Sequence, residues 1–267
     1  MLRPRTDIRH VRTLKKPHFS LPIPVPRTAP EAGAGDRRRI VISPHLDDAV
    51  LGCGQWLAGH PGTTVITLFA GMPDDGGQST DWDRRCGFAS AEDAMTARWE
   101  EDCQALALLQ STALWLEFRD SQYGRLAAPR QVADRLVRLL QSMRPHELFL
   151  PLGLFHADHL VAHEAAALAL RDCPVATAWA YEDALYRAMP GLLQQRLAQF
   201  EAEGIQATPI DPCTDGSALP LKRRAVDCYA SQLRALKSED LEDAWRPERL
   251  WKLEGGAFRR HPRGAAP

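Results

Sequence analysis

The chain has no long apolar run, almost no net charge and no closely spaced cysteines. None of its apolar stretches reaches the roughly 20 residues of a membrane-spanning helix or could form a signal-peptide core. A net charge of -1 creates no field that would favour nucleic acid or an anionic membrane. The 6 cysteines include no C-x-x-C pair, which disfavours a disulfide framework or a cysteine-zinc site. We therefore expect a cytoplasmic protein with no integral membrane segment and no nucleic-acid partner.

The composition is that of an ordinary globular protein, with 45% hydrophobic and 25% charged residues. Residues 1–38 are rich in proline and basic side chains, so we expect an N-terminal extension there. Residues 39–267 are then expected to form a single domain. The sequence leaves the oligomeric state open, and a homo-oligomer is one option.

From residue 39 the pattern alternates between β-branched apolar runs and helical segments. Strands are expected at 39–43, 63–70, 113–118, 146–150 and 175–181, and helices at 49–58, 91–109, 129–143, 159–171, 192–203 and 221–236. This alternation predicts an α/β fold with a mostly parallel sheet and helices on both faces. Residues 71–88, rich in glycine, aspartate and tryptophan, are expected to form a long excursion.

Two polar clusters follow strand-like runs: Ser43-Pro44-His45-Leu46-Asp47-Asp48 and Phe155-His156-Ala157-Asp158-His159. The carboxyl ends of parallel strands share one edge of the sheet, where such folds build their active sites. Histidine and carboxylate are the ligands of catalytic divalent metals, and three protein ligands leave a coordination position for water. The clusters therefore predict one metal site formed from two distant segments.

In the first cluster, His45 and Asp48 are spaced so that both side chains can converge on one point. Asp47, beside them, could accept a proton from water. The structural alternative is that Asp47 or Asp48 only caps the following helix.

In the second cluster, His159 could supply the third ligand and Asp158 could orient a histidine through its ring nitrogen. His163 lies one helical turn later and offers an alternative H-x-x-x-H pair, although a lone histidine there is more often a packing residue. A zincin motif would need glutamate directly after the first histidine, and Leu160 stands there.

At this point the chain resembles a known family. Pro44-His45-Leu46-Asp47-Asp48 and His156-Ala157-Asp158-His159 are similar to the P-H-x-D-D and H-x-D-H motifs of the PIG-L/LmbE-like de-N-acetylases. Arg98-x-x-Glu101 and Lys222-x-x-Ala225-Val226-x-x-Tyr229-x-Ser231-Gln232 are further matches, so the resemblance spans about 39–232. It implies a Rossmann-like sheet and hydrolysis of the acetamide of an N-acetylglucosamine conjugate.

The resemblance also implies roles. His45, Asp48 and His159 would be the metal ligands, and Zn²⁺ the cofactor, with Fe²⁺ as an alternative occupant. Asp47 would be the general base, and His156 would stabilise the oxyanion or protonate the leaving amine. Asp158 would position a histidine.

Other residues are expected to contact substrate. Arg84, in the 71–88 excursion, would belong to a rim that selects the substrate, although a structural flap is an alternative. Arg98 comes from the R-x-x-E match, and Tyr181 and Glu182 end a predicted strand at the active edge, where they could bind sugar hydroxyls. Ala157 stands where the family often has proline.

The expected partner is therefore a small N-acetylated amino-sugar conjugate. Three alternatives remain at this stage. A dehydrogenase is disfavoured because Gly52-Cys53-Gly54 lacks the third glycine of G-x-G-x-x-G. A metal-dependent hydrolase of an ester or phosphoester would use the same ligands. A non-catalytic sugar-binding module would be expected to lack Asp47 or a ligand, and all are present.

Overall fold

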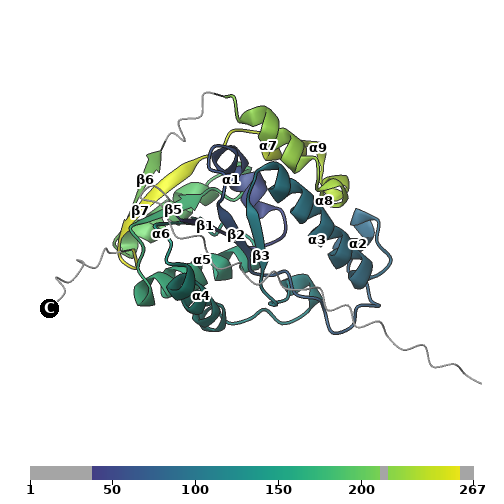
Figure 1. The fold of residues 1–267 in the computed structure, drawn as a ribbon, viewed down its shortest axis with the longest axis horizontal. Coiled ribbons are helices and arrows are strands. Elements are labelled where there is room, and N and C mark those ends of the chain that lie inside the picture. Colours follow the sequence, from purple (N-terminus) through teal and green to yellow (C-terminus); the bar gives the residue numbers. More distant parts are fainter. Residues whose placement is uncertain (1–37, 211–215, 259–267) are drawn as a thin grey trace, which may run out of the picture. The chain divides into compact units, whose positions relative to one another are not determined.

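The computed structural model describes residues 38–210 and 216–258. Almost all of the predicted N-terminal extension lies outside these residues. The described chain forms a seven-stranded sheet in the order β3-β2-β1-β4-β5-β7-β6 (Figure 1). The strands are β1 (Arg39–Ser43), β2 (Thr64–Thr67), β3 (Thr112–Trp115), β4 (Glu147–Pro151), β5 (Thr177–Tyr181), β6 (Ile205–Ile210) and β7 (Leu250–Gly255).

The first five strands pair in parallel, as the alternating pattern predicts. In contrast, β7 runs antiparallel to both β5 and β6. Strands β6 and β7 were not predicted, because both are partly exposed and neither is a continuous apolar run: β6 contains Gln206 and Pro209, and β7 contains Lys252 and Glu254. The expected α/β fold with a mostly parallel sheet is confirmed, with an antiparallel edge added.

Nine α-helices occur in the described residues: α1 (Asp48–Ala58), α2 (Asp81–Cys86), α3 (Ala91–Leu108), α4 (Pro129–Met143), α5 (Ala157–Asp172), α6 (Leu192–Ala202), α7 (Leu219–Val226), α8 (Ala230–Ala235) and α9 (Ser238–Ala244). Two predictions change. The 71–88 excursion contains helix α2, whose capping box joins Thr80 and Asp83. The helix expected at 221–236 is two helices, separated at 227–229. No helix in the described ranges is both long and apolar enough to cross a bilayer.

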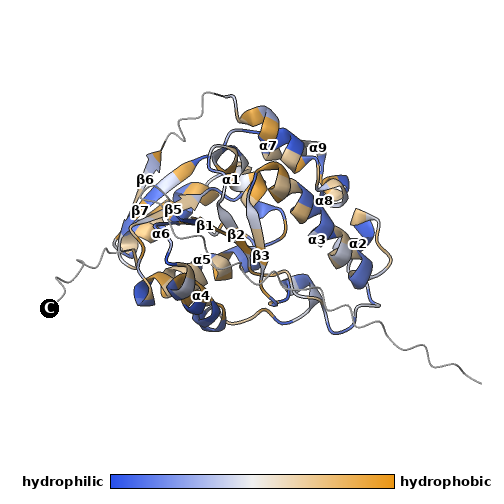
Figure 2. Cartoon of the chain, viewed as in Figure 1, coloured by the Kyte–Doolittle hydropathy of each residue, from blue (hydrophilic) through white to orange (hydrophobic). Residues whose placement is uncertain are grey.

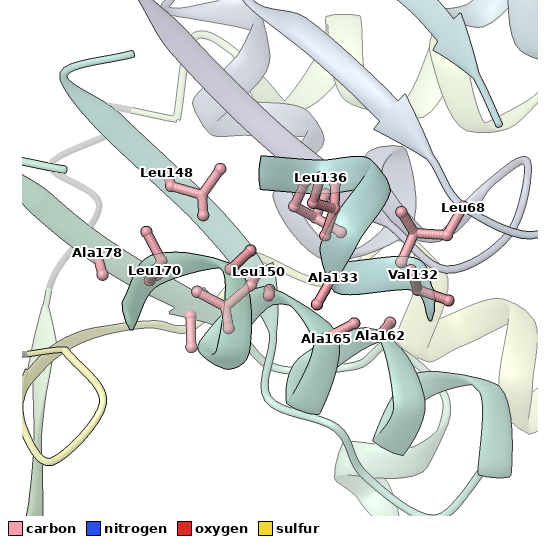
Figure 3. Close-up of a cluster of buried hydrophobic side chains, with 14 of the residues drawn as sticks. Leu68, Val132, Ala133, Leu136, Leu148, Leu150, Ala162, Ala165, Leu170 and Ala178 are labelled. Carbon is pink, nitrogen blue, oxygen red and sulfur yellow. The ribbon is translucent and has the colours of Figure 1, made fainter. Parts of the chain in front are cut away.

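Helices cover both faces of the sheet. α4 and α5 pack on one face, and α1, α3 and α7 lie on the other (Figure 1). Figure 3 shows the first of these layers, in which Val132 and Leu136 of α4 meet Ala162 and Ala165 of α5 above Leu150. The outward side of α4 is hydrophilic (Figure 2). Small alanines on α5 allow α4 to approach closely, which keeps the layer densely packed.

Helix α1 is broken one turn after the first polar cluster. Cys53 has non-helical dihedral angles, so the neighbouring backbone groups lose their helical partners. A buried ion pair replaces them: Lys222 Nζ donates to the Leu51 carbonyl, while Glu248 accepts the N–H groups of Gln55 and Trp56. Lys222 Nζ and Glu248 Oε1 lie 3.0 Å apart and both side chains are fully buried. The C-terminal segment therefore fixes the helix that carries Asp48.

We expect Lys222→Met to destabilise the protein by about 3–5 kcal/mol, because the variant leaves Glu248 charged, buried and without its cation. Urea unfolding of the full chain would measure this. The matched control is Lys252→Met, which breaks the partly exposed Lys252–Glu254 pair and should cost less than about 1 kcal/mol. Equal losses in the two variants would contradict a structural role for the buried pair.

Candidate active site

The first polar cluster forms the turn between β1 and α1. Ser43, the last residue of β1, accepts the Ala49 N–H with its hydroxyl and so begins the helix. Asp47 precedes α1, but its side chain makes no capping hydrogen bond. Asp48 accepts the His45 backbone N–H at 2.8 Å, which closes the turn. The cap interpretation of Asp47 therefore has no support, and its carboxylate lines a cavity.

The three predicted ligands come together. Donor atoms of His45, Asp48 and His159 all lie within 4.8 Å of one another. Asp48 Oδ2 is 3.1 Å from His45 Nδ1 and 3.3 Å from His159 Nε2. Two imidazoles and one carboxylate are a donor set that suits zinc or another transition metal. The residues present therefore fit a divalent ion.

In both His45 and His159, the ring nitrogen that faces away from Asp48 forms a hydrogen bond with a second, buried carboxylate. His45 Nε2 lies 2.9 Å from Asp158 Oδ2, and His159 Nδ1 lies 2.5 Å from Asp183 Oδ1. Such contacts fix the tautomer and orientation of metal-binding imidazoles. A second possible donor group consists of His45, His156 and Asp158. The first group fits better, because it leaves Asp158 free to orient His45.

Asp183 was missed by the sequence reasoning. It follows directly on Tyr181 and Glu182, and its carboxylate also accepts the N–H groups of Gly153 and Leu154. It therefore links the end of β5 to the loop after β4. The available signal was a third polar residue beyond the strand end, but the sequence alone does not say which of two adjacent acids points to the site.

Charge interactions in the cluster shift several pKa values. Burial raises the pKa of Asp47 to about 7, and the charge of Asp48 adds to this effect. Burial would also raise the pKa of Asp48, but His159 and His45 outweigh it and hold that pKa well below its usual range. Burial opposes protonation of His159, yet Asp48 and Asp183 raise its pKa to about 9. Asp47 is thus the carboxylate of this pair that titrates near neutrality.

His156 differs from the other two histidines. Burial lowers its pKa, and the charge of His45 lowers it further. Its Nδ1 accepts the Asp158 backbone N–H at 3.3 Å. The neutral ring then carries its proton on Nε2, which makes that nitrogen a hydrogen-bond donor.

The cluster forms the floor of a cavity of about 550 Å³. Its wall includes residues from α2, from the loop after β5 and from the α8–α9 segment, which are far apart in sequence. Lining residues outside the predicted site include Trp82, Arg85, Asp120, Gln122, Phe155, Tyr186, Met189, Gln232, Leu236, Lys237 and Asp240.

Two of the predicted substrate contacts lie away from this cavity. Tyr181 is fully buried and its hydroxyl donates to the Ile42 carbonyl, while its ring packs so closely on Gly52 that a Cβ there would clash. Glu182 is also buried, where it accepts from Trp251 Nε1 and pairs with Arg249. Both side chains therefore stabilise the β5 end and do not face the substrate.

The predicted arginines are divided. Arg84 is exposed and pairs with Asp81 outside the cavity, whereas its neighbour Arg85 lines the wall. Arg98 does line the cavity, but its guanidinium is held by Asp83 and the Tyr123 hydroxyl, each at 2.8 Å. Of the adjacent pair, Arg85 and not the predicted Arg84 lines the cavity.

The excursion is a fixed wall, because α2 is bound to α8. Trp82 Nε1 donates to Gln232 Oε1 at 2.9 Å. Arg85 donates to the Ala235 carbonyl, and Arg234 donates back to the Cys86 carbonyl at 2.8 Å. The segment is therefore fixed in position, and its role in substrate selection stays a prediction.

The remaining motif residues are structural. Glu101 accepts both the backbone N–H and the hydroxyl of Ser231, and Tyr229 donates to Asp102 at 2.8 Å. His163 does not join the metal cluster: its Nδ1 bonds the Pro151 carbonyl, and burial with the charge of Arg196 lowers its pKa to about 3. The alternative H-x-x-x-H ligand pair is thus not formed.

The comparisons with known proteins agree with this geometry. Residues 40–170 match the PIG-L family model, described as GlcNAc-PI de-N-acetylase. Over these residues the chain is similar to the PIG-L family. The match covers both polar clusters and the sheet strands β1 to β4. No curated protein sequence matches the chain.

Solved structures show the same PIG-L fold. A triple mutant of Orf2, a deacetylase of teicoplanin biosynthesis, is 26% identical with a TM-score of 0.70, covering 82% of this chain and 98% of that one. The A40926 pseudoaglycone deacetylase Dbv21 is 24% identical with a TM-score of 0.66, covering 83% and 99%. GalB, a 4-carboxy-2-hydroxymuconate hydratase from Pseudomonas putida KT2440, is 17% identical with a TM-score of 0.59, covering 86% and 100%. The last two likenesses concern the fold alone.

We expect Asp183→Asn to weaken Zn²⁺ binding by about 10- to 100-fold while His45, Asp48 and His159 remain, because the charge that orients His159 is lost. Competition with a chromophoric chelator would measure the affinity. The matched control is Glu182→Gln, which alters the adjacent buried carboxylate but no histidine contact. Unchanged zinc affinity in a folded Asp183→Asn variant would show that Asp183 only supports the loop after β4.

Proposed function

We propose that this protein hydrolyses the acetamide of an N-acetylglucosamine-type conjugate, releasing acetate and a free amine. The observation that carries the proposal is the convergence of His45, Asp48 and His159 at the floor of a cavity. The carboxylate of Asp47 lies beside them and makes no helix-capping hydrogen bond. The family match and the deacetylases among the similar structures support the choice of an amide bond.

His45, Asp48 and His159 would hold the metal, with Zn²⁺ as the proposed ion and Fe²⁺ as the alternative. When bound, such an ion supplies Lewis acidity to the acetamide and to water. Asp158 and Asp183 keep the two imidazoles in the orientation that ligation requires.

Asp47 would act as the general base. Its carboxylate lines the cavity, has no capping partner, and has a pKa of about 7 through burial and the charge of Asp48. A base with a pKa near the working pH accepts a proton efficiently in the transition state. The proton that Asp47 takes from water can then be returned to the leaving nitrogen.

His156 would stabilise the developing charge on the acetamide oxygen. Since its Nδ1 accepts a backbone N–H, Nε2 is the available donor. A single preorganised donor of this kind can contribute about 3 kcal/mol to transition-state stabilisation. The neutral ring suffices for this task, so no preceding protonation of His156 is required.

Two wider expectations remain proposals. Residues 39–267 would form one catalytic domain. The cytoplasm would be its compartment, and the five cysteines of the described residues, all free thiols, support this assignment.

We expect Asp47→Asn to lower kcat/KM for acetate release by roughly 100-fold or more at near-normal zinc content, because the proton acceptor is lost and the size is kept. His159→Ala is the contrasting variant and should lose the metal itself. Acetate release from N-acetylglucosaminides, with metal analysis of both variants, would test this. Wild-type turnover in Asp47→Asn would refute the assignment of the base, and release of phosphate or alcohol without acetate would favour a hydrolase of another bond.

A further inference from the structure

The outer part of the catalytic cavity carries exposed apolar side chains. Among the described residues, the exposed large hydrophobic side chains are Met72, Phe155, Leu160 and Met189. Two of these line the cavity: Phe155, which is 59% exposed, and Met189, which is 38% exposed. Tyr186 connects them, because its ring centroid lies 5.5 Å from that of Phe155 and its carbonyl accepts the Met189 N–H. We call Phe155, Tyr186 and Met189 the apolar lip.

The lip is built on two constrained loops. Phe155 has a left-handed backbone conformation with φ of 55°, next to Gly153 and Leu154, whose N–H groups bind Asp183. On the other loop, Leu185 has φ of 70° and donates its N–H to Asp243 at 2.8 Å. Non-glycine residues in this region cost energy and are concentrated at functional sites. Both loops are therefore held in place before any ligand arrives.

The lip also borders the catalytic centre directly. Tyr186 lies 6.1 Å from His156 and 5.3 Å from His159 between ring centroids, and Phe155 immediately precedes His156. A substrate whose acetamide reaches the floor must extend past these rings. An apolar group at this point of the substrate would cover Phe155 and Met189, which are exposed and line the same cavity.

The rest of the wall does not create a strong charge of one sign. The Arg85 guanidinium lies over the Trp82 ring, and its Nη2 donates a hydrogen bond to the Ala235 carbonyl. Lys237 also lines the wall, but Asp240 lies beside it and accepts its backbone N–H. An anionic group on the substrate would therefore meet mixed charges here, whereas an apolar group would meet the side chains of the apolar lip.

We propose that the apolar lip selects amino-sugar substrates that carry an apolar aglycone. This inference rests on the proposed function and names the substrate class of the same cavity. Binding energy from the aglycone is gained far from the reacting bond and can be used in the transition state. Because the lip is preorganised, little of this energy is spent on ordering loops.

The test compares benzyl and methyl glycosides of N-acetylglucosamine, in both anomers, with the full-length zinc-loaded protein. We expect kcat/KM for acetate release to be at least tenfold higher for the benzyl glycoside. In the double variant Phe155→Ala/Met189→Ala this ratio should fall to nearly one. Leu160→Ala is the matched control, since Leu160 is equally exposed but does not line the cavity, and it should keep the ratio.

The outcomes separate the two proposals. Acetate release at equal rates from both glycosides, or a benzyl preference that survives in the double variant, would overturn the lip assignment and leave the deacetylase proposal intact. A preference for N-acetylglucosamine 1-phosphate over the benzyl glycoside would also overturn it. Calorimetric binding is measured in parallel: tighter binding of the benzyl glycoside without acetate release would support the lip and refute the proposed reaction.

Discussion

The constraint on which the site depends is charge balance in a buried cluster. Asp47, Asp48, Asp158 and Asp183 meet three histidines within one small volume, and carboxylates that are removed from water need cationic partners. The two ligand histidines supply these contacts from both ring nitrogens. A divalent cation bound at this cluster would also compensate the negative charge of the buried carboxylates. Asp47 has the least compensation, which is why its pKa is near neutral and why it is the residue suited to exchange protons.

The scaffold meets this constraint by tying distant segments to the strand ends. Asp183 connects the β5 end to the loop after β4 and to His159, and Lys222 with Glu248 secures the broken helix α1 behind Asp48. Small displacements of ligand groups are costly in catalysis, because reacting groups must be held within a fraction of an ångström. The buried ion pair is thus best understood as support for the position of α1.

Much of this arrangement follows from sequence patterns. The five parallel strands show as apolar runs, and the two polar clusters follow β1 and β4, so the meeting of His45, Asp48 and His159 at one sheet edge was predictable. Strands β6 and β7 were not predicted because half-exposed strands mix polar and apolar residues. Tyr181 and Glu182 were placed in the site by position alone. Residues alternate between the two faces of a strand, and the orientation beyond its end depends on loop conformation, which local sequence does not determine. Asp183 and Tyr186 were missed for that reason.

The hydrogen bonds between α2 and α8 join a segment inside the family match to a segment beyond it. Residues 40–170, which match the family, contain all three proposed metal ligands and the proposed base. Three parts of the site lie after residue 170: Asp183, the loop that carries Tyr186 and Met189, and helix α8, which binds the 71–88 excursion. The proposed ligands and base therefore lie within the family match, whereas part of the cavity wall comes from the stretch after it. Substitutions at Tyr186 or Met189, unlike those at Asp183, would reshape the cavity wall while the contacts of the proposed ligands are kept.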